Sequence, residues 1–93
     1  MFIGACTLRI QLFETHSLKE KRQILRSIIE RCKNRFNISV AEVGLFDSWQ
    51  VSEIGFACVS SEKLHADKII RNVIRFIDGD GRVEITSHDI EIL

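Results

Sequence analysis

The chain has 93 residues, of which 45% are apolar and 28% are charged, and its formal net charge at pH 7 is zero. This length is that of one domain, residues 1–93, built around one hydrophobic core. The composition is typical of a folded globular protein, and no apolar run approaches the roughly 20 residues that cross a bilayer. The N-terminus lacks the basic region of a secretory signal peptide, so we expect a cytoplasmic protein with no membrane partner.

The three cysteines, Cys6, Cys32 and Cys58, are odd in number and far apart in the sequence. A secreted chain of this size would carry an even and denser set that forms disulfides. We therefore expect reduced thiols that pack in the core, rather than a redox or metal site.

Two periodic patterns divide the first part of the chain. Apolar and polar residues alternate over residues 2–13, which predicts a half-buried strand. Ser17 followed by Glu20 is a capping-box pattern and predicts the start of a helix. Apolar residues then recur at helical spacing as far as Phe36, and Asn37 is expected to close the helix.

The next segments predict a β-hairpin. Residues 38–46 and 49–60 are rich in apolar, β-branched and aromatic residues, which is typical of strands. Asp47 and Ser48 lie between them and predict a tight turn, in which the Asp47 carboxylate hydrogen-bonds the turn backbone. We expect Trp49 to pack at the base of this hairpin.

The last third of the chain predicts a second helix and a fourth strand. Ser60 or Ser61 is expected to cap the helix. The segment DGDG, residues 78–81, ends it, because glycine reaches the positive φ that a helix terminus and a turn require. In the final strand the apolar alternation shifts phase after His88 and Asp89, which predicts a β-bulge or a bend.

The order of the predicted elements is β-α-β-β-α-β. With right-handed crossovers this order predicts an α+β, ferredoxin-like sandwich: a four-stranded antiparallel sheet with two helices on one face. The other face of the sheet is then left to solvent or to a partner. On that face we expect Arg9 to lie beside Glu53 or Glu84 as a cross-strand charge pair.

Three stretches, SLKEKR at residues 17–22, RFNISVAEVGLFDSWQ at 35–50 and GFACVS at 55–60, resemble the YlxP-like family of small bacterial proteins of unknown function. The resemblance covers essentially the whole chain. It implies a ferredoxin-like fold and a bacterial cytoplasmic protein. Members of this family are often encoded among translation and ribosome-maturation genes, which implies association with RNA or the ribosome. The family has no agreed activity, so the resemblance implies no catalytic residue.

The predicted first helix is the most basic part of the chain. Residues 1–37 carry eight basic and three acidic side chains, whereas residues 38–93 carry five basic and ten acidic ones. On a helical wheel, four cations lie within about 60° on one flank of the apolar stripe, and two lie on the opposite flank. The candidate nucleic-acid-binding residues are Lys19, Arg22, Arg26 and Lys33 on the first flank, and Lys21 and Arg35 on the second.

More than one interpretation of this basic helix stays open. Unpaired cations in a row suit phosphates, because each neutralised phosphate releases a counterion, and ribosomal RNA or a ribosomal subunit is the expected partner. Alternatively, the cations form a solvated helix face, pair with the protein's own carboxylates, or dock an acidic protein. A homodimer formed by sheet stacking or edge pairing, with no nucleic acid bound, is the second function we consider.

Other polar residues give weaker indications. Glu42 is a lone acid in an apolar strand, and it either faces solvent or binds Lys21 or Arg22. The central strands of the sheet offer no pair of aromatic residues, so we do not expect bases to stack there.

The sequence favours a protein that is not an enzyme. Ferredoxin-like folds host acyl-phosphate hydrolysis, but that chemistry needs a glycine-rich anion cradle, and the segment FETHSLKEK at 13–21 has no glycine. His16, His65 and His88 are scattered over three predicted elements without ligand spacing. We therefore expect no catalytic residue, no metal and no cofactor.

Overall fold

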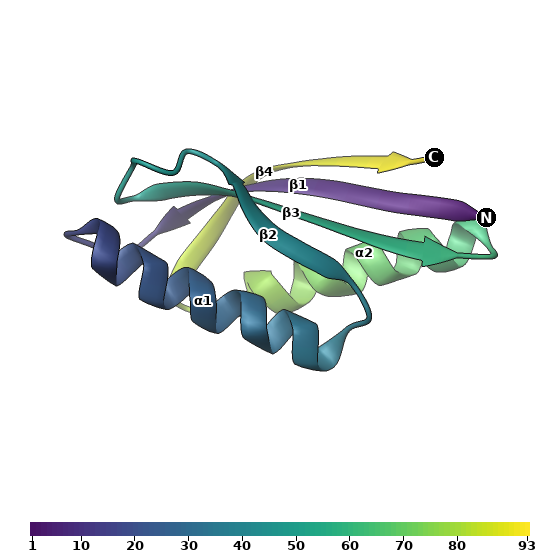
Figure 1. Cartoon of the computed structure of the whole chain (residues 1–93), viewed down its shortest axis with the longest axis horizontal. Coiled ribbons are helices and arrows are strands. Elements are labelled where there is room, and N and C mark those ends of the chain that lie inside the picture. The colour runs from purple at the N-terminus through teal and green to yellow at the C-terminus, as the bar shows by residue number, and fades with distance from the viewer.

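A computed structural model describes all 93 residues and contains the six elements in the predicted order. The strands are β1 (Phe2–Leu12), β2 (Ser39–Gly44), β3 (Val51–Ser60) and β4 (Val83–Ile92), and the helices are α1 (Leu18–Arg35) and α2 (Lys63–Asp78). The strands form one antiparallel sheet in the order β2-β3-β1-β4, and both helices cover the same face (Figure 1). The predicted α+β, ferredoxin-like sandwich is confirmed. Neither helix is long and apolar enough to cross a membrane.

One hydrophobic core of 16 buried residues lies between the sheet and the two helices. It includes Cys6, Cys32 and Cys58, which are free thiols, as the sequence predicted. Burial, and then the nearby Asp89 carboxylate, raises the pKa of the Cys6 thiol to about 11. Burial also raises the pKa of Cys32 above its usual value. Both side chains are therefore protonated and act as small apolar residues.

A β-bulge in β4 explains the shift in its apolar pattern. Arg9 of β1 pairs with Ser87, whereas the next residue, Ile10, pairs with Ile85. Thr86 is therefore the extra residue, and the apolar side chains on both sides of it face the helices. The predicted bulge is confirmed, a few residues earlier in the chain than the pattern indicated.

The start of α1 follows the capping-box prediction. The Ser17 hydroxyl accepts the backbone N–H of Glu20 at 3.1 Å, and the Glu20 carboxylate accepts the N–H of His16 at 2.7 Å. The helix ends at Arg35 with Phe36 as its C-cap, one residue earlier than predicted. At the N-terminus, the hydrogen bonds of Ser17 and Glu20 satisfy backbone N–H groups that would otherwise lack a partner.

The start of α2 differs from the prediction. Its N-cap is Glu62, which makes no side-chain cap, so neither Ser60 nor Ser61 caps the helix. The Ser60 hydroxyl instead accepts the N–H of Glu62 at 3.1 Å and hydrogen-bonds with Nδ1 of His65 at 3.0 Å. Ser60 therefore organises the approach to the helix from a position two residues before the N-cap.

The turn after α2 does not depend on positive φ, so that part of the prediction is wrong. Gly79 has a φ of −76°, and no glycine has a positive value. The turn is held by Asp80, whose carboxylate accepts the Arg82 backbone N–H at 3.0 Å and its guanidinium at 2.7 Å. The Arg82 guanidinium also donates to Ser27 of α1 at 3.1 Å. The Arg82 hydrogen bond holds the pKa of Asp80 below its usual range.

The second face of the sheet is uncovered, as the two-helix architecture predicts. On this face Arg9 of β1 lies opposite Glu53 of β3, and its guanidinium donates to the carboxylate at 2.7 Å. Glu84, the other predicted partner, lies opposite Gln11 instead. One of the two alternative charge pairs is therefore confirmed.

Candidate nucleic-acid interface

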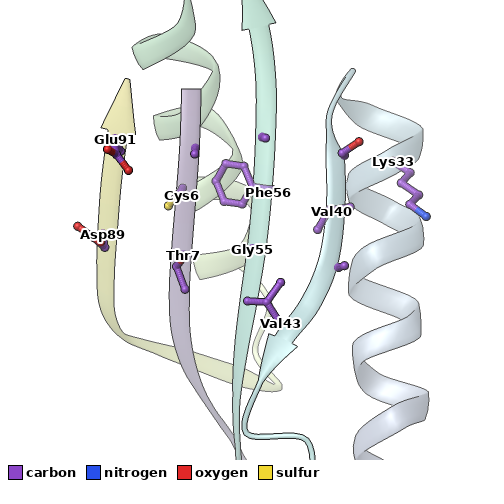
Figure 2. A pocket seen from close by; sticks show the side chains of 13 residues that line it. Cys6, Thr7, Lys33, Val40, Val43, Gly55, Phe56, Asp89 and Glu91 are labelled. Carbon is purple, nitrogen blue, oxygen red and sulfur yellow. The ribbon is translucent and has the colours of Figure 1, made fainter. Parts of the chain in front are cut away.

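Helix α1 packs beside the edge strand β2 (Figures 1 and 2). Its buried side chains recur at intervals of three and four residues, which places them on one stripe that faces the sheet. They are Lys21, Leu25, Ile28 and Cys32. This stripe fixes the rotation of the helix, and therefore decides which of its cations reach solvent.

Four cations of α1, which we call the basic stripe, lie on the flank predicted from the sequence. They are Lys19, Arg22, Arg26 and Lys33, and all four are exposed. No carboxylate lies within 4.0 Å of any of their charged nitrogens. Four of the other six arginines have acidic partners, and Arg35 and Arg75 do not; the paired ones are Arg9, Arg31, Arg71 and Arg82. The structure therefore keeps the cations of the basic stripe available to an external anion.

The basic stripe is not explained by helix stability. It extends from Lys19 to Lys33, a length of roughly 21 Å at the rise of an α-helix. Arg22 and Arg26 are four residues apart, and like charges at that spacing destabilise a helix by about 0.2–0.5 kcal/mol. The row of unpaired cations thus brings a small cost to the fold.

Lys21 does not belong with the exposed cations. Its side chain is 1% exposed, and its ammonium lies 3.1 Å from the Glu42 carboxylate. The same ammonium donates to the backbone carbonyls of Leu45 at 2.7 Å and Ser48 at 2.6 Å. A buried ammonium requires a counter-charge and an acceptor for each of its three N–H groups. Lys21 therefore serves the fold, and its prediction as a nucleic-acid-binding residue is wrong because the side chain is buried.

Glu42 reaches Lys21 because strand alternation places it on the same side of β2 as the buried Val40, toward the helices. Glu42 pairs with the buried residue Ile54 of β3, and Val43 is the extra residue in this register. The Ser52 hydroxyl donates a second hydrogen bond to the Glu42 carboxylate at 2.7 Å. Of the alternatives that the sequence left open for Glu42, pairing with Lys21 is confirmed.

Arg35 lies on the opposite flank of α1, toward α2. Its guanidinium is 5.9 Å from the Phe36 ring centroid and 5.2 Å from that of Phe76. Arg31 on the same flank is 5.4 Å from the Phe76 ring and 3.6 Å from the Asp80 carboxylate. These arginines contact side chains of the second helix and its following turn, so Arg35 is separate from the basic stripe.

The connection between β2 and β3 is longer than the tight turn predicted. β2 ends at Gly44 and β3 begins at Val51, which leaves residues 45–50 as a loop. Asp47 makes no hydrogen bond to the turn backbone, and the loop is held instead by Lys21, which donates to the carbonyls of Leu45 and Ser48. Trp49 was expected to pack at the base of the hairpin. It is 51% exposed, so only about half of its surface is covered by the fold.

The uncovered face of the sheet contains a shallow cavity of about 630 Å³ (Figure 2). Most residues of its floor on this face have small side chains: Ala5, Thr7, Ser39, Ala41, Gly55 and Ala57. Asp89 and Glu91 of β4 line one side, and Lys33 lines the other beyond β2. Apart from the aliphatic Val43, the exposed groups of this cavity are therefore small or charged, and none is aromatic.

The three histidines are scattered over the fold. His16 precedes α1, His65 lies on α2 and His88 lies on β4. No group of three or more His, Cys, Asp or Glu side chains is placed so that it could hold a metal ion.

Comparison with known proteins assigns this chain to a family. The family model described as "Protein of unknown function (DUF503)" matches residues 3–90. The uncharacterized protein YlxP of Bacillus subtilis (strain 168) is 38% identical over 84 residues, which cover 90% of this chain and 91% of that protein. The resemblance to YlxP-like proteins is therefore confirmed, and the chain belongs to the DUF503 family of proteins of unknown function.

Proposed function

We propose that this protein is a cytoplasmic, non-catalytic accessory protein that binds RNA, as a free molecule or within the ribosome, through the basic stripe. One observation carries the proposal: four exposed cations on one flank of α1 have no acidic partner in the molecule. Arg35, which lies on the other flank, is left outside this surface. The gene context that the YlxP resemblance implies favours ribosomal RNA as the partner.

The physical basis of the proposal is release of counterions. Each phosphate that a cation neutralises frees a condensed ion, so the logarithm of affinity falls by about 0.7–0.9 per contact for each unit of log salt. Four contacts predict a slope near −3. Such an interaction is strong at low salt and independent of base sequence.

The test measures binding of ribosomal RNA and of ribosomal subunits across a salt series. Arg22→Ala/Arg26→Ala removes two cations of the basic stripe, and we expect weaker binding at low salt and a slope shallower by about 1.4–1.8. The matched control is Arg71→Ala/Arg75→Ala, which removes two exposed arginines at the same spacing from α2. Equal effects of the two double variants, or no binding at low salt, contradict the proposal.

A second candidate function is a homodimeric interaction module that binds no nucleic acid. The sheet register favours it, because Ser39, Ala57, Ala5 and Glu91 form one row across the uncovered face. Lys33 lines the end of the cavity opposite Glu91. A two-fold axis parallel to the strands would set Lys33 of each copy against Glu91 of the other. Sedimentation over a concentration series tests this alternative, and a monomer at every concentration contradicts it.

A further inference from the structure

Two large aromatic side chains on the β2–β3 loop are not buried by the fold. Phe46 is 56% exposed and Trp49 is 51% exposed. Neither ring pairs with another aromatic ring or with a cation of the molecule. We call these two residues the aromatic tip. Because exposed rings contribute little to the core, folding does not account for two of them in one short loop.

The loop is held in one conformation by groups beneath it. The Lys21 ammonium binds the carbonyls of Leu45 and Ser48, and the buried Thr15 hydroxyl donates to the carbonyl of Trp49 at 2.8 Å. Leu45 has a φ of 59°, a left-handed conformation that is unfavourable for a residue with a side chain. These contacts position the aromatic tip before any ligand arrives, which lowers the entropic cost of binding.

The aromatic tip lies at the end of the molecule where the basic stripe begins. Lys21, which holds the loop, lies near the start of α1, as do the exposed cations Lys19 and Arg22. Figure 1 shows the β2–β3 loop at the same end of the molecule as the start of α1. Asp47, between the two aromatic residues in the sequence, adds one negative charge to the loop.

We propose that the aromatic tip stacks against unpaired bases of a single-stranded RNA whose phosphates lie along the basic stripe. This inference rests on the proposed function and adds the class of RNA. A duplex hides the faces of its bases, whereas a single strand exposes them to aromatic rings. Stacking is worth about 1–3 kcal/mol per base and tolerates any base, so it complements the sequence-independent contacts of the cations.

The surroundings of the tip favour RNA over a protein partner. The loop residues beside the rings include the polar Asp47 and Gln50 and the less exposed apolar Leu45, and the nearest part of α1 presents unpaired cations. Aromatic rings beside cations are the combination that single-strand-binding surfaces use.

The chain carries its own reporter for this contact, because Trp49 is its one tryptophan. Titration with a single-stranded oligoribonucleotide at low salt is expected to quench the fluorescence of Trp49. The same sequence as a duplex is expected to bind through the basic stripe with little quenching. A third titration uses total protein extracted from ribosomal subunits, and a response to that fraction alone overturns the assignment to RNA.

Phe46→Leu tests the affinity while it keeps the reporter in place. We expect binding of the single strand to weaken roughly tenfold, with duplex binding and the salt slope unchanged because no charge is removed. The control is Leu64→Ala, which shortens another exposed apolar side chain at the start of α2. Trp49→Leu provides a second affinity variant, read by electrophoretic mobility, and near-native circular dichroism confirms that each variant folds.

Two kinds of failure are distinguishable. If Phe46→Leu and Trp49→Leu leave single-strand binding unchanged while Arg22→Ala/Arg26→Ala weakens it, the tip does not stack bases and the proposed function stands. If the tip variants weaken single-strand and duplex binding equally, the preference for unpaired bases is overturned. If neither the tip nor the stripe variants change binding, both proposals fail.

Discussion

The two flanks of α1 carry the same kinds of side chain and have different environments. On the flank toward α2, Arg31 and Arg35 contact Phe76, and Arg31 also approaches Asp80. On the flank beside β2, Arg26 and its neighbours in the basic stripe have no partner. A cation at the seam between two helices finds a ring of the second helix and an acid of the turn that follows it, whereas one beside an edge strand meets solvent. The position of a charge relative to the second layer thus decides whether it serves the fold.

The largest expected effect separates the buried cation of α1 from its exposed ones. Lys21→Met leaves the largely buried Glu42 carboxylate without its counter-charge, and we expect the free energy of unfolding to fall by about 3–5 kcal/mol. Urea denaturation measures this loss. Lys33→Met is the matched control, because it is the same substitution on an exposed side chain, with an expected change within about 0.5 kcal/mol. Similar losses in the two variants would disprove the contrast.

A smaller effect is expected at the turn that joins α2 to β4. Asp80→Asn weakens the hydrogen bonds to Arg82 and lowers the free energy of unfolding by roughly 1–3 kcal/mol at neutral pH. The pKa of Asp80 is depressed in the folded state, so the stabilisation is full above the ordinary value of 3.8 and is lost as pH falls through the folded pKa. The difference between wild type and variant should therefore shrink in acid.

Thermal or urea unfolding at several pH values measures that difference. Asp78→Asn is its control, because this exposed acid two residues earlier makes no ion pair. If the difference in the free energy of unfolding between wild type and Asp80→Asn stays constant from neutral pH to well below 3.8, the role of the Asp80 charge is contradicted.

The smallest expected effect on the free energy of unfolding comes from a direct comparison of the two flanks of α1. Arg31→Ala removes contacts with Phe76 and Asp80, and we expect a loss of about 0.5–1 kcal/mol. Arg26→Ala removes an unpaired cation and relieves repulsion from Arg22, so stability should stay unchanged or rise by about 0.2–0.5 kcal/mol. Differential unfolding of the two variants in one denaturant series resolves the contrast. A larger loss for Arg26→Ala than for Arg31→Ala would show that the flanks are assigned the wrong way round.

Much of the architecture was predictable because it follows from local periodicity. The alternation around Arg9 and the helical spacing after Ser17 define their elements without reference to distant residues. The phase shift near His88 was visible as well, and the bulge at Thr86 is its cause. The β2–β3 turn was misjudged, because the signal for it lies in Lys21, more than twenty residues away.

In the candidate site, too, local patterns predicted some features, and contacts with distant residues decided the others. A helical wheel places Lys19 and Arg22 on one flank, and the structure agrees. The wheel also places Lys21 near the apolar sector, but it does not say which acid or carbonyl receives the ammonium. The exposure of Trp49 depends on how the loop is held, so no local pattern predicted it.

The sequence by itself determined the six elements, the ferredoxin-like order and the row of cations on one helix flank, since these depend on residues close together in the chain. Tertiary structure decided which cations stay free, because that depends on acids and carbonyls brought from distant segments. It buried Lys21 against Glu42, directed Arg31 toward Asp80 and left the basic stripe in solvent. The free-energy cost of burying a charge grows with the hydration that the charge loses, and a partner must offset this cost. Only tertiary packing determines how much hydration each charge loses.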